Sequence, residues 1–130
     1  MPRLTRWFIR AGLLYLLAAL VLRVGLAHDP AGLPAGLQPA TFHLFVVGWI
    51  TQLIFGVAHW MFPRASRDRP RGAESLGWAA FALLNAGLLL RLMSEPALLL
   101  PGGWLALSGG LQLAGALCWV LLIWPRVKER

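Results

Sequence analysis

The chain has 130 residues, of which 58% are hydrophobic and 13% are charged, and its formal net charge is +7. So high an apolar fraction in so short a chain excludes a soluble globular domain, because most of the surface must face an apolar medium. The excess of basic over acidic residues does not indicate nucleic-acid binding. No basic patch interleaved with aromatic residues lies in a unit that could fold in water.

Four apolar segments are long enough for a helix to cross a bilayer, which takes about 20 residues. We predict spans at residues 7–27, 39–62, 74–93 and 104–124. Together they consume most of the chain and leave no room for a separate soluble domain. The expected fold class is all-α: an integral membrane four-helix bundle that forms a single domain over residues 1–130.

The segment boundaries carry their own signals. The start, MPRLTRWFIRAG, resembles the basic region of a signal peptide, but the apolar run after it is too long and GLAHDP is a poor cleavage site. We therefore expect a retained first helix. The connector HDPAGLPAGLQPA is rich in Pro and Gly and cannot continue a helix. Pro39 suits the first turn of the second span, Pro63 ends it, and Pro125 stops the fourth.

Basic residues gather on one side of this four-span topology. Ten of the twelve lie at the N-terminus, in the 64–71 loop or in the C-terminal tail. The positive-inside rule therefore places both termini and that loop in the cytoplasm. The Leu-, Ala-, Arg- and Gly-rich, Lys-poor usage is typical of a bacterial high-GC genome, so we expect a multi-pass protein of the bacterial cytoplasmic membrane. Tryptophans near the span ends fit an interfacial belt: Trp7, Trp60, Trp78, Trp104 and Trp124.

Polar residues also lie at membrane depth. Gln52, Asn85 and Gln112 fall near the midpoints of three spans, where contact with lipid is costly, so we expect interhelical hydrogen bonds. Gly48, Gln52 and Gly56, at i, i+4 and i+8, form a stripe that another helix can approach closely, which favours self-association. The same close approach is predicted where Gln112 lies between two glycines, Gly109 and Gly115.

No acidic residue lies deep in a span, which argues against a small proton-coupled transporter, since such proteins need a membrane carboxylate. Cys118 is the only cysteine, and no C-x-x-C-H motif is present, so covalent c-type haem attachment is excluded.

Three histidines remain as candidate ligands. His43 lies one turn inside the outer end of the second span, and His59 follows 16 residues later. That spacing corresponds to about 24 Å along the helix axis, so the two cannot bind one metal ion. His59 is expected at the cytoplasmic interface, in contact with headgroups. His28 lies on the same side as His43, and neutral imidazoles are good axial ligands of haem iron.

Two arginines near the outer ends of the first and third spans, Arg23 and Arg91, depart from the positive-inside pattern. One interpretation is that both extend their guanidinium groups to the outer headgroups. The other is that they bind an anion, such as the carboxylates of a haem, with their fork of donors.

The pattern H-L-F-V-V-G-W-x-x-x-x-x-F-G-V-A-x-W-x-x-P, residues 43–63, resembles the second helix of the catalytic subunit of haem-copper oxidases. It is most similar to the cbb3-type and nitric oxide reductase branches, and to small four-span proteins that are similar to that subunit. The resemblance implies that His43 is an axial ligand of a low-spin haem b. It covers about 22 of the 130 residues. The second ligand is then His28, His43 of a second copy, or absent.

The chain lacks the further histidines that hold the second haem and copper in that family, so we do not expect a stand-alone enzyme. The leading hypothesis is a b-type haem-binding protein, related to the oxidase subunit, for electron transfer or haem handling in a respiratory context. In it, His43 binds the iron and Arg23 and Arg91 lie near the propionates. The alternative is a structural or assembly subunit of a respiratory membrane complex without a cofactor. Both hypotheses include contact with membrane lipid and either a homo-oligomer or a larger complex.

Overall fold

The computed structural model describes residues 1–29, 31–34, 36–63, 73–95 and 103–127. These residues are mostly helical, and no strand occurs in any of the described ranges. In chain order the helices are α1 (Arg3–His28), α2 (Leu37–His43), the π-helix η1 (Leu44–Thr51), α3 (Gln52–Met61), α4 (Glu74–Ser94), α5 (Trp104–Ile123) and the 3₁₀ turn η2 (Trp124–Arg126).

The helices form four segments that are long and apolar enough to cross a membrane: α1, the continuous run Leu37–Met61, α4, and Trp104–Arg126. The prediction of an all-helical chain with four candidate spans is therefore confirmed at that level. α1 begins at Arg3, four residues before the predicted start at position 7. The predicted arginine-rich loop, 64–71, lies outside the described residues.

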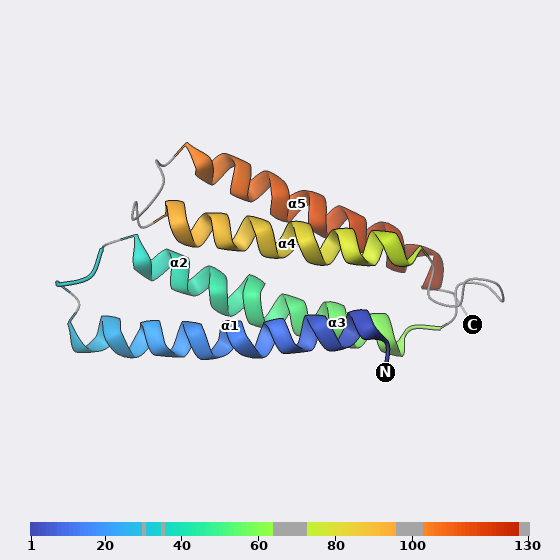
Figure 1. Cartoon of the computed structure of the whole chain (residues 1–130), viewed down its shortest axis with the longest axis horizontal. Coiled ribbons are helices and arrows are strands. Elements are labelled where there is room, and N and C mark those ends of the chain that lie inside the picture. Colours follow the sequence, from blue (N-terminus) through green and yellow to red (C-terminus); the bar gives the residue numbers. More distant parts are fainter. Residues whose placement is uncertain (30, 35, 64–72, 96–102, 128–130) are drawn as a thin grey trace.

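The bundle consists of two helix pairs (Figure 1). α1 lies along η1 and α3, and α4 lies along α5, while α2 and η1 also contact α4. The start of α1, the end of α3, the start of α4 and η2 lie at one end, which we call the basic end. The end of α1, the start of α2, the end of α4 and the start of α5 lie at the other, which we call the opposite end.

Apolar side chains join the two pairs. Near the basic end, Phe8 of α1 makes edge-to-face contacts with Phe55 of α3 at 6.0 Å and with Phe81 of α4 at 5.1 Å between ring centroids. Nearer the opposite end, a second cluster is centred on Ala19, Leu44 and Leu88. Aromatic pairs in these geometries each add about 0.5–1.5 kcal/mol beyond area burial.

Large apolar side chains cover much of the outside of the bundle. Leu14, Val21 and Val24 of α1 are exposed, as are Leu113 and Leu121 of α5. So large an exposed apolar surface marks a protein that contacts lipid or another apolar partner. The tryptophans singled out at the predicted span ends are exposed as well: Trp7, Trp60, Trp78, Trp104 and Trp124.

The π-helical segment η1 was not predicted. It occupies the middle of the second span, where the Thr51 hydroxyl donates to the carbonyl of Val46, five residues earlier, at 2.9 Å. A π-turn contains more residues than an α-turn, and such segments are frequent at functional sites. Because η1 lies between His43 and Gln52, the directions of those two side chains do not follow regular α-helical spacing.

Candidate functional site

The midplane polar residues bind one another. The Asn85 Oδ1 atom of α4 accepts hydrogen bonds from the Tyr15 hydroxyl of α1 at 2.9 Å and from the Gln52 amide of α3 at 3.1 Å. The Asn85 amide donates to the carbonyl of Phe81 at 2.7 Å. Gln52 is fully buried, and its Oε1 atom has no hydrogen-bond partner in the structure. These bonds connect three helices, as packing residues do in membrane bundles.

Gln112 belongs to a separate contact between α4 and α5. Its amide donates to the Ser108 hydroxyl at 3.1 Å, and that hydroxyl donates to the carbonyl of Gly87 at 2.7 Å. At Gly115 an added Cβ would lie 3.0 Å from the backbone nitrogen of Leu84, so α4 does approach there. At Gly109 it would meet nothing within 4 Å, so no helix of the same chain approaches closely at Gly109 among the described residues.

The stripe of Gly48, Gln52 and Gly56 faces α1 of the same chain. An added Cβ at Gly48 would lie 2.8 Å from the Cβ of Tyr15, and one at Gly56 would lie 2.9 Å from the Cβ of Phe8. The close approach predicted from the stripe therefore takes place within the chain. Because α1 covers these positions, they provide no surface for a second copy, and the stripe no longer argues for self-association.

His43 lies at the opposite end, where α2 joins η1. Its Nδ1 atom lies 3.0 Å from the carbonyl oxygen of Pro39 and 3.9 Å from the Oε2 atom of Glu95, at the end of α4. A carbonyl oxygen can only accept a hydrogen bond, so Nδ1 carries the proton and neutral His43 keeps its lone pair on Nε2. Metal-binding histidines are commonly oriented by such a bond. The His43 side chain is 28% exposed, which leaves part of the ring accessible.

Arg91 binds Glu95 rather than a free anion. Its Nε and Nη2 atoms donate to the two carboxylate oxygens at 3.0 and 2.8 Å, and the Glu95 side chain is only 11% exposed. This is the two-bond geometry that suits guanidinium and carboxylate. Glu95 was not singled out from the sequence, although its i, i+4 spacing from Arg91 is a usable signal for this ion pair.

Arg23 and His28 lie elsewhere at the opposite end. Arg23 is exposed and lines a pocket that does not include His43. His28 is exposed at the last residue of α1, and the described part of the chain shows no hydrogen bond or ion pair between it and His43. The structure thus links His43 to Arg91 through Glu95 but does not place Arg23 or His28 in contact with His43.

His59 is buried, so the prediction of a headgroup contact is wrong. The Nη1 atom of Arg126 lies 3.3 Å from its Nδ1 atom. Arg126, like His59, is only 1% exposed and donates to the backbone carbonyls of His59, Phe62 and Pro63 at 2.9, 2.8 and 3.0 Å. The turn η2 brings this arginine against the end of α3, which the positive-inside pattern could not reveal.

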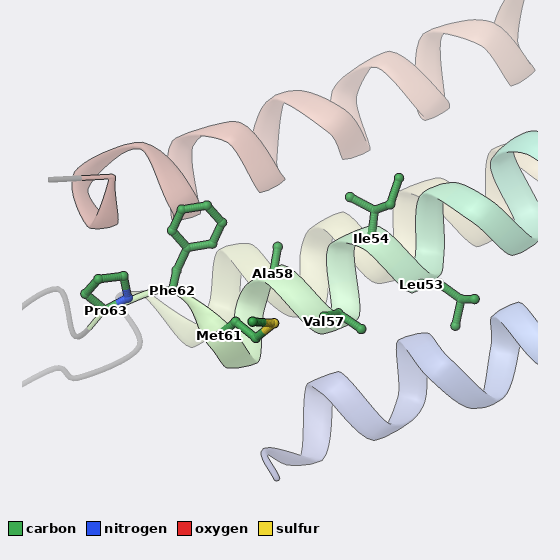
Figure 2. A pocket seen from close by; sticks show the side chains of 7 residues that line it. All are labelled: Leu53, Ile54, Val57, Ala58, Met61, Phe62 and Pro63. Atoms are coloured by element: carbon green, nitrogen blue, oxygen red, sulfur yellow. The ribbon is translucent and has the colours of Figure 1, made fainter. Parts of the chain in front are cut away.

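An apolar hollow of about 580 Å³ lies along α3 and is lined by side chains between positions 53 and 63 (Figure 2). Ile54, Ala58 and Phe62 point toward α5 in this view, while Leu53 and Met61 lie on the α1 side. The lining side chains are apolar and include the thioether of Met61, so the hollow supplies no charge for a polar substrate.

Comparison with protein-family models, with curated proteins and with solved structures gave no match. Within the described ranges, no group of three or more histidine, cysteine, aspartate or glutamate side chains could hold a metal ion. Among the candidate ligands, His43 is the one whose partly accessible ring is oriented by a hydrogen bond to a backbone carbonyl.

Proposed function

We propose that the chain is a multi-pass protein of the bacterial cytoplasmic membrane that binds haem b through His43. The role is electron transfer or haem handling in a respiratory context, without catalysis by this chain alone. The single observation that supports it most is the hydrogen bond from His43 Nδ1 to the Pro39 carbonyl, which leaves Nε2 as the ligating nitrogen.

The donor set fits a haem at one axial position. A neutral imidazole is a common axial ligand, and a bound haem supplies reversible one-electron chemistry. The Pro39 carbonyl accepts the Nδ1 proton and so orients Nε2 away from that side of the ring, while Glu95 lies 3.9 Å from Nδ1. Arg91, held by Glu95, is not offered to a propionate, and Arg23 lines a separate pocket. The second axial position would be taken by His28, by His43 of a second copy, or by no residue of the protein.

The first test is an absorption spectrum of the detergent-purified protein, produced with ample haem, before and after reduction with dithionite. We expect sharp α and Soret bands in the wild type and their complete loss in His43→Ala. His59→Gln, on the same span, is the matched control: it keeps an acceptor for Arg126 and should retain the bands.

A wild-type spectrum without haem bands would exclude the cytochrome proposal. Bands that persist in His43→Ala would assign the haem to another ligand. Loss of the six-coordinate signature in His28→Ala, with a five-coordinate haem retained, would identify His28 as the second ligand.

A second candidate is a cofactor-free structural or assembly subunit of a respiratory membrane complex. The observation in its favour is that polar residues at membrane depth form hydrogen bonds between helices: Tyr15, Gln52, Asn85 and Ser108. A featureless spectrum together with stable co-purification of a respiratory complex would favour this candidate over the first.

We also propose that both termini face the cytoplasm, on the strength of the basic residues at the two ends of the chain. A reporter that is active only in the cytoplasm should be active when fused after residue 130. The same reporter inserted between positions 31 and 34 should be inactive, and the reverse pattern would contradict this topology.

A further inference from the structure

A pocket of about 740 Å³ lies at the opposite end of the bundle, between α1 and the start of the second span. Since His43 is not among its lining residues, the proposed haem site leaves it unused. Its walls come from three elements, α1, α2 and η1, and consist of Leu20, Arg23, Gln38, Pro39, Thr41, Phe42 and Phe45.

The polarity of the pocket changes along the bundle axis. Arg23 and Gln38 lie nearer the end of the bundle, while Leu20 lies about one turn deeper on α1. Phe45 follows Gln38 by seven residues, which places it about 10 Å deeper on the second span. The hydroxyl of Thr41 donates to the carbonyl of Leu37 at 2.7 Å, so it offers its proton to the backbone rather than to the pocket. The pocket therefore has a polar rim and an apolar floor.

Arg23 supplies the charge at the rim. It is exposed, and no hydrogen bond or ion pair joins it to any residue in the described ranges. It precedes the end of α1 by five residues, about 7.5 Å along the axis, so it lies just below the level of the helix end. A guanidinium at the boundary of an apolar layer is stabilised by an anion, and its planar fork of donors matches a phosphate. The guanidinium of Arg91, at a similar depth, is already paired with the carboxylate of Glu95.

We infer that this pocket binds one phospholipid with an anionic headgroup, taken from the leaflet at the opposite end. The phosphate lies against Arg23 and the Gln38 amide, and an acyl chain covers Leu20, Phe42 and Phe45. A free phosphate would leave the apolar floor uncovered. A zwitterionic lipid brings an ammonium together with its phosphate, so it adds no net negative charge to offset Arg23. The inference goes beyond the proposed haem site and does not depend on it.

The test is native mass spectrometry of the detergent-purified chain, titrated with phosphatidylglycerol or with phosphatidylcholine of the same acyl chains. We expect one phosphatidylglycerol to bind with about fivefold lower Kd than phosphatidylcholine, the ratio that corresponds to about 1 kcal/mol per basic residue near an anionic lipid surface. Arg23→Gln should remove the preference. Arg10→Gln, which changes another exposed arginine of α1 at the basic end, should keep it.

A second pair of variants tests the apolar floor without changing charge. Leu20→Trp fills the pocket and should weaken the binding of both lipids. Leu14→Trp places the same ring on the exposed face of α1 away from the pocket and should leave both affinities unchanged. Leu20 is itself exposed, so neither substitution disturbs the core.

Three results would overturn the inference. Arg10→Gln and Arg23→Gln could lose the lipid preference equally, or Leu20→Trp could bind both lipids as the wild type does. The third is that an equal concentration of inorganic phosphate displaces the lipid. Loss of haem bands in Arg23→Gln with unchanged lipid binding would also overturn it, and would assign Arg23 to a haem propionate. His43→Ala should bind phosphatidylglycerol like the wild type, so failure of the haem proposal and failure of this inference are distinguishable.

Discussion

Replacement of Arg126 by methionine is expected to lower the free energy of unfolding by about 1–3 kcal/mol, the usual cost of leaving buried hydrogen-bond acceptors without their donor. The arginine side chain donates to three backbone carbonyls at and just after the end of α3, those of His59, Phe62 and Pro63. The last carbonyls of a helix have no partner within it, so they depend on donors from elsewhere. Methionine has similar length but no donor.

The measurement is unfolding of the detergent-solubilised protein by increasing fractions of sodium dodecyl sulfate, followed by tryptophan fluorescence. Arg10→Met, at an exposed position of α1, is the control and should stay within about 0.5 kcal/mol of the wild type. Arg126→Lys should be intermediate, because a single ammonium cannot span three carbonyls as the guanidinium fork does. An Arg126→Met protein as stable as the wild type would show that η2 does not hold the end of α3.

Replacement of Gly87 by leucine is expected to cost about 3 kcal/mol and to separate α4 from α5. A Cβ at this position would lie 2.9 Å from the backbone oxygen of Ser108 and 3.0 Å from the backbone nitrogen of Gln112. Backbone atoms in a helix cannot move aside as a flexible side chain can, so the helices must shift. Overpacking of this kind typically costs about 1–3 kcal/mol, and the bond from Ser108 to the Gly87 carbonyl would be lost as well.

The same unfolding assay measures this cost, and α5 provides the control. Gly109→Leu adds the same side chain where nothing lies within 4 Å, so it should change stability by less than about 0.5 kcal/mol. Equal effects of the two substitutions would indicate that the cost comes from the loss of glycine itself and not from helix contact. A neutral Gly87→Leu would contradict the close packing of α4 on α5.

What the sequence by itself determined is the set of helices and their apolar character. Hydropathy over about 20 residues and the positions of prolines are local properties, so they located all four candidate spans to within a few residues. The sequence also placed Gln52, Asn85 and Gln112 at similar depth and selected His43 as the candidate ligand. Its assignment to haem stays a prediction, since no structural observation tests it.

Only the tertiary structure decided which faces meet. Arg126 and His59 are 67 residues apart, and neither charge counting nor periodicity could pair them. Likewise, the polar midplane divides into two groups because α5 packs on α4, with Gln112 bonded to Ser108 instead of to Asn85. The stripe of Gly48, Gln52 and Gly56 could pack against a second copy or against the chain's own α1. The sequence does not distinguish these two partners, because both contacts need the same small residues. Contacts of this kind depend on how helices rotate against one another, which side-chain packing across the whole bundle determines.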